Sequence, residues 1–416
     1  MINASFLNRI LYLVLTSMVS ILLWTCVGTE VNHSMTEAEM LAFHHSILTM
    51  DTHVDTPLRL LHEGINLSQH HDPHEYNSKL DFPRMDEGGL DAVFFAIWTP
   101  QGARTDSGHS AIKLQALDLL ELVEAELGKL PQSAEIVTNS DDASRLQARG
   151  KHAIYLGLEN GYPIGTDLEN LDLFYKRGVR YITLCHMTNN EICDSSNDTT
   201  EFGGLSPFGV EVVQRMNQLG MMVDISHTSE ATVEQAVAIS RAPVIASHSC
   251  AKAMCANPRN LSDSLLTLIA AKGGVVQMCL LSDYITPDPP QGARDSARAA
   301  LKKKWKNVDR QNDINREAYR LEWGELNRKF PRELPSVADA VDHIDHMVAL
   351  VGIDHVGIGS DFDGGAALSD CFDVSDLPNI TKELFKRGYS KADIKKIWSG
   401  NLLRVFGEVE QLASTG

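Results

Sequence analysis

Short apolar runs alternate with helix-like stretches along most of this chain. From about residue 42 onward, each run is rich in strand-forming residues and most end in a polar residue. Eight runs fit this description: residues 47–55, 90–98, 153–159, 180–186, 221–227, 244–248, 274–280 and 355–361. The clearest helical stretches between them are residues 111–127, 207–219, 230–240 and 262–271. Such alternation is typical of parallel strands joined by crossover helices. Eight units predict an α/β fold of the closed (β/α)8, or TIM-type, barrel.

One long polar segment interrupts this alternation. Residues 288–335 lie between the seventh and eighth predicted strands, and they contain Lys302, Lys303 and Lys304 followed by a stretch rich in Glu, Arg and Leu. A connection of this length without structure of its own is uncommon in a compact domain. We therefore expect one or two amphipathic helices inserted into the barrel, with the basic run on a solvated helix face.

The first 25 residues differ from the rest of the chain. Residues 10–24 are almost wholly apolar, which is too short for a spanning helix and fits the apolar core of a secretory signal. Cys26 follows directly, as the lipidated cysteine of a bacterial lipoprotein does, although Trp24 and Thr25 stand where small residues are usual. We predict a signal peptide at 1–25, a linker at 26–41 and the barrel domain at 42–410. The protein is then exported and held at the cell envelope, on the periplasmic or surface side, by a lipid on Cys26. A cleaved soluble signal and an uncleaved anchor are the alternatives.

Composition narrows the class of partner. Hydrophobic residues make up 43% of the chain and charged residues 22%, which is the composition of a globular protein. The net charge is -18, and binding to nucleic acid needs clustered Lys and Arg. We therefore expect no nucleic-acid partner.

The six cysteines after Cys26 leave two possibilities open. None forms a CxxC pair. Cys185 and Cys193, or Cys250 and Cys255, are close enough in sequence for disulfides in an oxidising compartment. Buried free thiols fit the same spacing equally well.

Residues of metal-binding or catalytic type stand at the ends of six of the eight predicted strands. They are His53 and Asp55 on the first, Glu159 on the third, His186 on the fourth, His227 on the fifth, His248 on the sixth and Asp361 on the eighth. One such residue alone is most often a packing or hydrogen-bonding residue. Active sites of β/α barrels, however, form where the C-terminal ends of the strands meet. The joint pattern therefore indicates one site, whereas His343 and His346 fit a solvated helix face.

Five of these residues suit a binuclear metal centre. Imidazole and carboxylate ligands together favour zinc or a related divalent ion. His53, Asp55, Glu159, His227 and His248 are more ligands than one tetrahedral zinc takes. They suffice for two ions that share a bridging carboxylate and an activated water. The sequence therefore predicts two zinc ions per chain.

Six motifs occur in an order that resembles a known family. They are MDTHVD (50–55), GLENG (157–161), RYITLCH (180–186), VDISH (223–227), PVIASHS (243–249) and VGIGSDFDG (356–364). In these stretches the chain closely resembles the membrane dipeptidase (renal dipeptidase) family of zinc peptidases, from about Asp51 to Phe406. Cys26 makes it similar to a bacterial, lipoprotein-type member, since the tail at 411–416 is not apolar like the C-terminal lipid signal of animal members.

The resemblance assigns the metal ligands. His53 and Asp55 look like ligands of one zinc, and His227 and His248 look like ligands of the other. Glu159 looks like the bridge between them.

The resemblance also assigns the catalytic and substrate-binding residues. His186 resembles the histidine that steadies the substrate's carbonyl oxygen, and Asp361 resembles the acid/base that moves the water's proton to the leaving amine. Asp363 is a second candidate for that base. Arg259, in NPRN (257–260), resembles the arginine that holds the substrate's carboxylate, for which a guanidinium fork is suited. Leu58 departs from the bulky aromatic residue of mammalian members near the first motif, so the side-chain pocket is expected to differ.

These roles imply hydrolysis of a small-molecule dipeptide by a hydroxide that bridges the two metal ions. A zinc-bound water ionises near neutral pH. A barrel does not fix its substrate, so hydrolysis of a lactone, ester or β-lactam is the nearest alternative, and a non-catalytic envelope binding lipoprotein is the second. Arg259 favours the dipeptidase, because a lactonase needs no clamp for a carboxylate. The family also implies a homodimer, which no feature of the sequence itself indicates.

Overall fold

The computed structural model describes residues 35–287, 292–306, 308, 313–331 and 333–414. The chain divides into two compact units, residues 1–40 and 41–416. Residues 35–40 of the first unit contain the start of helix α2 (Glu37–His44), where the Thr36 hydroxyl accepts a hydrogen bond from the backbone N–H of Glu39 (3.3 Å). The predicted signal peptide and Cys26 lie outside the described residues. None of the described helices has the length and apolar character needed to cross a bilayer.

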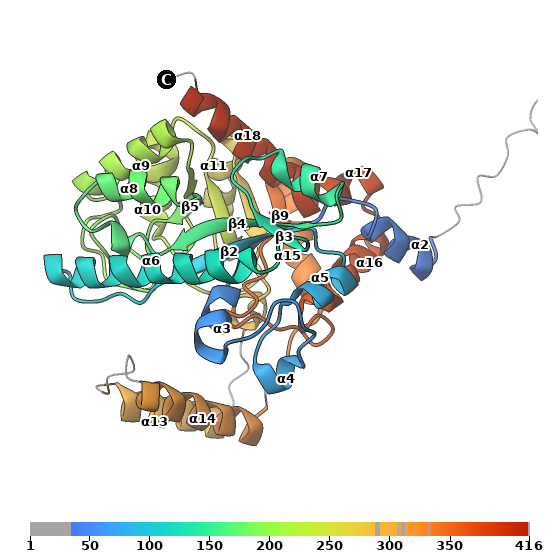
Figure 1. The fold of residues 1–416 in the computed structure, drawn as a ribbon, viewed down its shortest axis with the longest axis horizontal. Helices are drawn as coiled ribbons and strands as arrows, with labels where there is room; N and C mark the ends of the chain where they lie inside the picture. The colour runs from blue at the N-terminus through green and yellow to red at the C-terminus, as the bar shows by residue number, and fades with distance from the viewer. Residues whose placement is uncertain (1–34, 288–291, 307, 309–312, 332, 415–416) are drawn as a thin grey trace, which may run out of the picture. The chain divides into compact units, whose positions relative to one another are not determined.

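A parallel sheet forms the barrel of the second unit (Figure 1). In the described chain, eight strands follow one another around it in sequence order: β1 (Met50–Val54), β2 (Ala92–Trp98), β4 (His152–Glu159), β5 (Val179–Thr183), β6 (Met222–Asp224), β7 (Ile245–Ser249), β8 (Val275–Met278) and β9 (Val356–Ile358). The ring closes just beyond β9, where the backbone N–H of Asp361 donates to the carbonyl of His53 (3.0 Å). The predicted (β/α)8 barrel is confirmed. A ninth strand, β3 (Ala134–Ile136), was not predicted; it pairs with the first residues of β4.

Burial on both faces explains why the strands read as continuous apolar runs. All eight residues of β4 are buried, as expected for parallel strands between helices and a filled interior. Phe94 of β2 stacks on Tyr155 of β4 at a centroid distance of 4.8 Å and lies 5.2 Å from Tyr181 of β5. Phe406 packs edge-on against Tyr155. It belongs to the C-terminal helix α18 (Asn401–Ser414), which Figure 1 shows at the end of the barrel opposite α3 (Thr56–Glu63), the helix after β1. This packing fills one end of the barrel and leaves the C-terminal ends of the strands for a site.

Helices connect the strands and surround the sheet (Figure 1). The stretch predicted at 111–127 begins earlier, at residue 106, because the Thr105 side chain accepts from the N–H of Gly108 and caps the helix. The other three predicted helices match to within one residue at either end. The described helices of this unit outside the inserted segment are α3 (Thr56–Glu63), α4 (Pro73–Tyr76), α5 (Phe82–Gly88), α6 (Asp106–Gly128), α7 (Asp142–Gln147), α8 (Glu169–Lys176), α9 (Pro207–Leu219), α10 (Glu230–Ile239), α11 (Asp263–Ala271), α12 (Ser282–Ile285), α15 (Val337–Val351), α16 (Pro378–Lys386), α17 (Lys391–Lys395) and α18 (Asn401–Ser414).

The inserted segment between β8 and β9 forms two helices, α13 (Gly292–Trp305) and α14 (Asp313–Lys329), as predicted. They pack on each other through a small apolar cluster that includes Leu301, Trp305 and Leu326. The three lysines at 302–304 are exposed, which confirms the solvated face. The insertion therefore holds itself together by its own contacts.

The prediction of a solvated face was wrong for His343 on α15. This side chain is buried, its Nδ1 accepts from the backbone N–H of Ala251 (3.1 Å), and its Nε2 lies 3.0 Å from the carbonyl of Ile285. His346, one turn later, is partly exposed and pairs with Asp263. The pattern of charges on the helix did not reveal that His343 contacts Ala251 and the last residue of α12, Ile285.

The described cysteines are free thiols, one of the two possibilities that the sequence left open. All six that lie in the described part of the chain are buried, and none of them is in a disulfide. Cys185 and Cys193, one of the two predicted pairs, both belong to the apolar core.

Four predicted strands, the fourth, fifth, seventh and eighth, extend two or three residues too far at their C-terminal ends, so that His186 also lies beyond its strand, β5. The fifth was expected to end at His227 and the eighth at Asp361, but β6 ends at Asp224 and β9 at Ile358. His227 and Asp361 have φ angles of 69° and 66°, in the left-handed region that a strand does not use. Strained backbone of this kind clusters at functional sites.

Candidate metal centre

The predicted site residues meet in one pocket at the C-terminal ends of the strands. The pocket has a volume of about 350 Å³, and its polar lining includes Asp55, Glu159, His186, His227, His248 and Asp361. His53 is fully buried beside them, with its Nε2 atom 3.8 Å from Asp55 Oδ2. The structure thus brings together seven residues that are spread over more than 300 positions of the chain.

Glu159 lies at the centre of this group. Its Oε2 atom is 3.3 Å from His53 Nε2. Its Oε1 atom is 3.2 Å from His227 Nε2 and 3.7 Å from His248 Nε2. The two oxygens of one carboxylate therefore face two different sets of ligands, which is the arrangement that a bridge between two ions requires.

Several buried polar atoms at this point have no protein partner that fits them. His53 Nε2 and Asp55 Oδ1 make no hydrogen bond in the described structure. His227 Nε2 and His248 Nε2 lie only 2.9 Å apart, and His227 Nδ1 makes no hydrogen bond in the described structure. Unsatisfied buried groups are costly, and a cation is the partner that several converging lone pairs can share. The residues present therefore fit divalent metal ions.

Tyr181 fixes the orientation of His53. His53 Nδ1 is 2.9 Å from the Tyr181 hydroxyl, which in turn donates to the carbonyl of Thr52 (3.2 Å). Nδ1 of His53 is then the nitrogen that keeps its hydrogen, and Nε2 is the nitrogen that would exchange its proton for a metal. Gly157 of β4 makes room for this contact, because a Cβ atom there would lie 2.1 Å from the Tyr181 ring.

The buried charges influence one another strongly. Burial opposes ionisation of Glu159, but His53 and His186 beside it hold its pKa well below the usual range. Burial also disfavours protonation of His53, yet Glu159 more than compensates and the pKa of His53 rises to about 10. For His227, burial first and Arg259 second lower the pKa well below its usual value. His227 thus stays neutral, the form in which histidine binds a metal.

Asp361 and Asp363 stand on one turn but have different surroundings. The Asp363 carboxylate accepts from the Thr56 hydroxyl (2.7 Å) and from the backbone N–H of Lys79 (2.7 Å). Asp361 faces the pocket, and its only hydrogen-bond donor among the described side chains is the weak thiol of Cys279 (3.9 Å). Burial raises the pKa of Asp361 well above its usual range. Both residues line the pocket, and of the two Asp361 has fewer protein partners.

Gly364 allows two carboxylates to approach the same turn. A Cβ atom at this position would lie 2.0 Å from Asp361 Oδ1 and 2.2 Å from Asp55 Oδ2. A larger residue would therefore push both side chains out of place.

His186 lines the pocket, whereas Arg259 is not among its lining residues and lies behind them. The His186 side chain is 24% exposed, with Nε2 3.5 Å from Glu159 Oε1 and its ring edge-on to Trp98. Arg259 is buried, and it donates from Nη1 to Ser249 Oγ (2.8 Å) and from Nη2 to the carbonyl of His248 (2.6 Å). Its Nε makes no hydrogen bond in the described structure. Arg259 is therefore held rigidly with a donor to spare.

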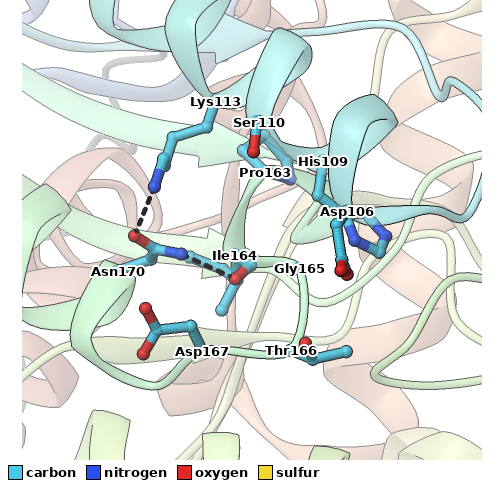
Figure 2. A pocket seen from close by; sticks show the side chains of 10 residues that line it. All are labelled: Asp106, His109, Ser110, Lys113, Pro163, Ile164, Gly165, Thr166, Asp167 and Asn170. Atoms are coloured by element: carbon cyan, nitrogen blue, oxygen red, sulfur yellow. Dashed lines mark hydrogen bonds between the residues drawn. The ribbon is translucent and has the colours of Figure 1, made fainter.

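A second hollow, of about 160 Å³, lies between α6 and the loop that follows Glu159 (Figure 2). Lys113 Nζ donates to Asn170 Oδ1 (3.1 Å), and Asn170 Nδ2 donates to the carbonyl of Ile164 (2.9 Å). None of the metal-ligand groups found among the described residues lies there. The first pocket is therefore the candidate active site.

A parallel β/α barrel with histidine and carboxylate ligands at its C-terminal end defines a metal-dependent hydrolase of the barrel class. The sequence profile of the membrane dipeptidase family, peptidase family M19, matches residues 37–416. The chain belongs to this family and is a metallo-dipeptidase, as the motifs predicted.

Individual relatives agree with this assignment. The chain is 30% identical over 381 residues to Dipeptidase 3 of Rattus norvegicus, a match that covers 90% of this chain and 67% of the rat protein. It is 31% identical over 349 residues to Dipeptidase aclJ of Aspergillus oryzae, covering 82% and 72%. The solved structure of the probable dipeptidase PvdM from Pseudomonas aeruginosa has a TM-score of 0.79 at 32% identity, covering 91% of this chain and 99% of that one.

Sequence reasoning missed the residues that support the ligands. Tyr181 and Asp224 were part of quoted motifs but received no role, and Trp98 and Tyr284 were not singled out although both line the pocket. A buried polar residue inside an apolar strand was the available signal for Tyr181 and Asp224.

Proposed function

We propose that this chain binds two zinc ions and uses them to hydrolyse dipeptides. The central position of Glu159, between His53 on one side and His227 and His248 on the other, is the observation that carries the proposal. His53 and Asp55 would hold one ion, His227 and His248 the other, and Glu159 both. When bound, such ions lower the pKa of a water and polarise a carbonyl group.

The protein's own groups orient the dipeptide and move the proton. Asp361 accepts the proton of the attacking water and passes it to the amine that leaves when the C–N bond breaks. His186, at the mouth of the pocket, donates to the carbonyl oxygen as that atom gains negative charge. The walls formed by Leu58, Trp98 and Tyr284 exclude water around the substrate. Leu58 stands where mammalian members have an aromatic residue, so the side-chain preference is expected to differ from theirs.

A screen of dipeptides tests this function. Metal-free protein is reconstituted with zinc, and hydrolysis of L,L- and L,D-dipeptides is followed by release of free amino acid. We expect two ions per chain by elemental analysis and turnover of at least one dipeptide class. Turnover of lactones, esters or β-lactams with no dipeptide hydrolysis would overturn the substrate assignment. Two bound ions without any turnover would favour a binding protein.

Arg259→Lys is expected to raise the KM for dipeptides by about 10–100-fold, with a smaller change in kcat. A lysine keeps the charge but loses the planar fork and the bonds to Ser249 and His248, and a charge-assisted hydrogen bond contributes about 1.5–3 kcal/mol. Steady-state kinetics on the best dipeptide measures the effect. An N-acetylated amino acid amide, which has no carboxylate, serves as control ligand. If the two proteins have equal KM values, Arg259 does not bind the carboxylate.

We further propose that the mature chain begins at Cys26 and is anchored in a membrane by a lipid. The support is the short apolar segment that ends at this cysteine. Cys26→Ser is expected to release the protein from the membrane fraction or to block its processing, as measured by fractionation and by mass spectrometry of the N-terminus. Unchanged membrane association together with an unchanged N-terminus would disprove the anchor. The homodimer implied by the family resemblance stays a prediction.

A further inference from the structure

The two proposed metal positions differ in the negative charge around them. Ligand atoms of His53, Asp55 and Asp361 lie within 4.8 Å of one another, and Glu159 Oε2 is close by. The first position, at His53 and Asp55, is therefore surrounded by three carboxyl groups, those of Asp55, Glu159 and Asp361, which a cation would bind in their ionised form. The second position, at His227 and His248, has one oxygen of the shared Glu159 and two imidazoles whose pKa values burial lowers, and His186 lies beside it. Coulomb attraction in a buried site is strong, so the first position attracts a divalent ion more.

Arg259 increases this difference. Its guanidinium is buried and donates to the backbone carbonyl of His248, a ligand of the second position. A buried positive charge is poorly screened by salt. The positive charge of Arg259 therefore repels a metal ion at His227 and His248 more strongly than a metal ion at His53.

The buried carboxylate of Asp224 has the opposite effect to Arg259, because it favours a metal ion at the second position. His248 Nδ1 lies 2.9 Å from Ser247 Oγ, and Ser247 Oγ donates to Asp224 Oδ2 (2.6 Å). Because the serine hydroxyl gives its proton to Asp224, its oxygen accepts the N–H of His248, and Nε2 of His248 keeps its lone pair. An outer partner of this kind fixes the tautomer and raises the basicity of a ligand histidine.

Asp224 is fixed in place for this task. It is fully buried and also accepts from the backbone N–H groups of Ser226 (3.1 Å) and Ser247 (2.8 Å) and from the Thr183 hydroxyl (2.5 Å). The corresponding contact of His53 is with Tyr181, a neutral phenol that leads only to a backbone carbonyl. The anionic relay thus reaches the ligands through His248, a ligand of the proposed second position whose ring also lies beside that of His53.

We propose that the two ions bind with unequal affinity, tightly at His53 and Asp55 and weakly at His227 and His248, and that the weak position depends on Asp224 acting through Ser247. Asp224 and Ser247 are then positioning residues. The inference rests on the proposed two-ion function. Its consequence is that activity follows the concentration of available metal, because the second ion leaves first.

Titration of the metal-free full chain with cobalt(II) tests this order. The visible absorption of bound cobalt and competition with a chelator report each binding step. We expect two separate steps for the wild type. In Ser247→Ala and Asp224→Asn the first step should be unchanged and the second weakened about 10–100-fold, the usual cost of losing an outer-shell partner. Asp224→Glu should weaken the second step as Asp224→Asn does. Ser247→Cys should weaken it less than Ser247→Ala does.

Two further variants make the result specific. Ser240→Ala removes a buried hydroxyl that bonds Asn217 and Ala242 away from the metal centre, and both of its steps should match the wild type. His227→Ala removes a ligand of the second position, so this variant should bind cobalt in one step only. The absorption spectrum of that step identifies the first step of the wild type. Circular dichroism checks folding, and if Asp224→Asn does not fold, Ser247→Ala carries the test.

The outcomes separate this inference from the proposed function. One ion in the wild type, two ions of equal affinity, or variants that weaken both steps equally or only the first would overturn the inference. Hydrolysis of dipeptides by the zinc-loaded wild type is measured independently. Unequal binding without hydrolysis would contradict the function alone, and hydrolysis with equal binding would contradict the inference alone.

Discussion

Glu159→Gln is expected to lose both metal ions and with them dipeptide hydrolysis. The carboxylate turns one oxygen to His53 and the other to His227 and His248. An amide offers one oxygen and one NH2 group, which is a donor and cannot bind a cation. Metal affinity should therefore fall by more than the roughly 10–100-fold typical of outer-shell changes. Elemental analysis after gel filtration measures the ions that remain per chain.

Glu191→Gln is the matched control for this change. Glu191 is also largely buried, and it pairs with Arg104 and His109 rather than with the metal ligands. This variant should keep both ions. If Glu159→Gln also retains two ions at wild-type affinity, Glu159 is not the bridge, whatever its effect on turnover.

Asp361→Asn is expected to retain both ions and bind substrate nearly normally while losing about 10²–10⁴-fold in kcat. The amide keeps the shape of the side chain but cannot accept the proton of the attacking water. The five other ligands, His53, Asp55, Glu159, His227 and His248, remain in place. The rival interpretation makes Asp361 a ligand, since it lies in one ligand-type group with His53 and Asp55. Metal content and single-turnover kinetics of the same preparation separate the two.

Asp363→Asn completes this comparison. The Asp363 carboxylate is already occupied by Thr56 and Lys79, so its loss should disturb the turn and reduce kcat less than the Asp361 change. Loss of metal in step with activity in Asp361→Asn would make Asp361 a ligand. Near-full turnover in Asp361→Asn with an inactive Asp363→Asn would make Asp363 the base.

The sequence alone determined the architecture and the candidate site residues. Burial on both faces makes the strands of a parallel barrel continuous apolar runs, so β4 and β2 could be recognised without coordinates. The position of Glu159 and His248 at the ends of such runs placed them on one edge of the barrel. The inserted helices were likewise visible as a long polar segment with helical composition.

Only the tertiary structure decided the exact strand ends, the supporting contacts and the state of the buried groups. His227 and Asp361 lie beyond their strands in left-handed conformations, which no strand propensity predicts. The contacts of His53 with Tyr181 and of His248 with Ser247 and Asp224 depend on which side chains cross the barrel interior. The free thiols and the burial of His343 were equally undetermined. A sequence pattern records the face on which a residue lies, whereas its partners come from segments brought close only by packing of the whole chain.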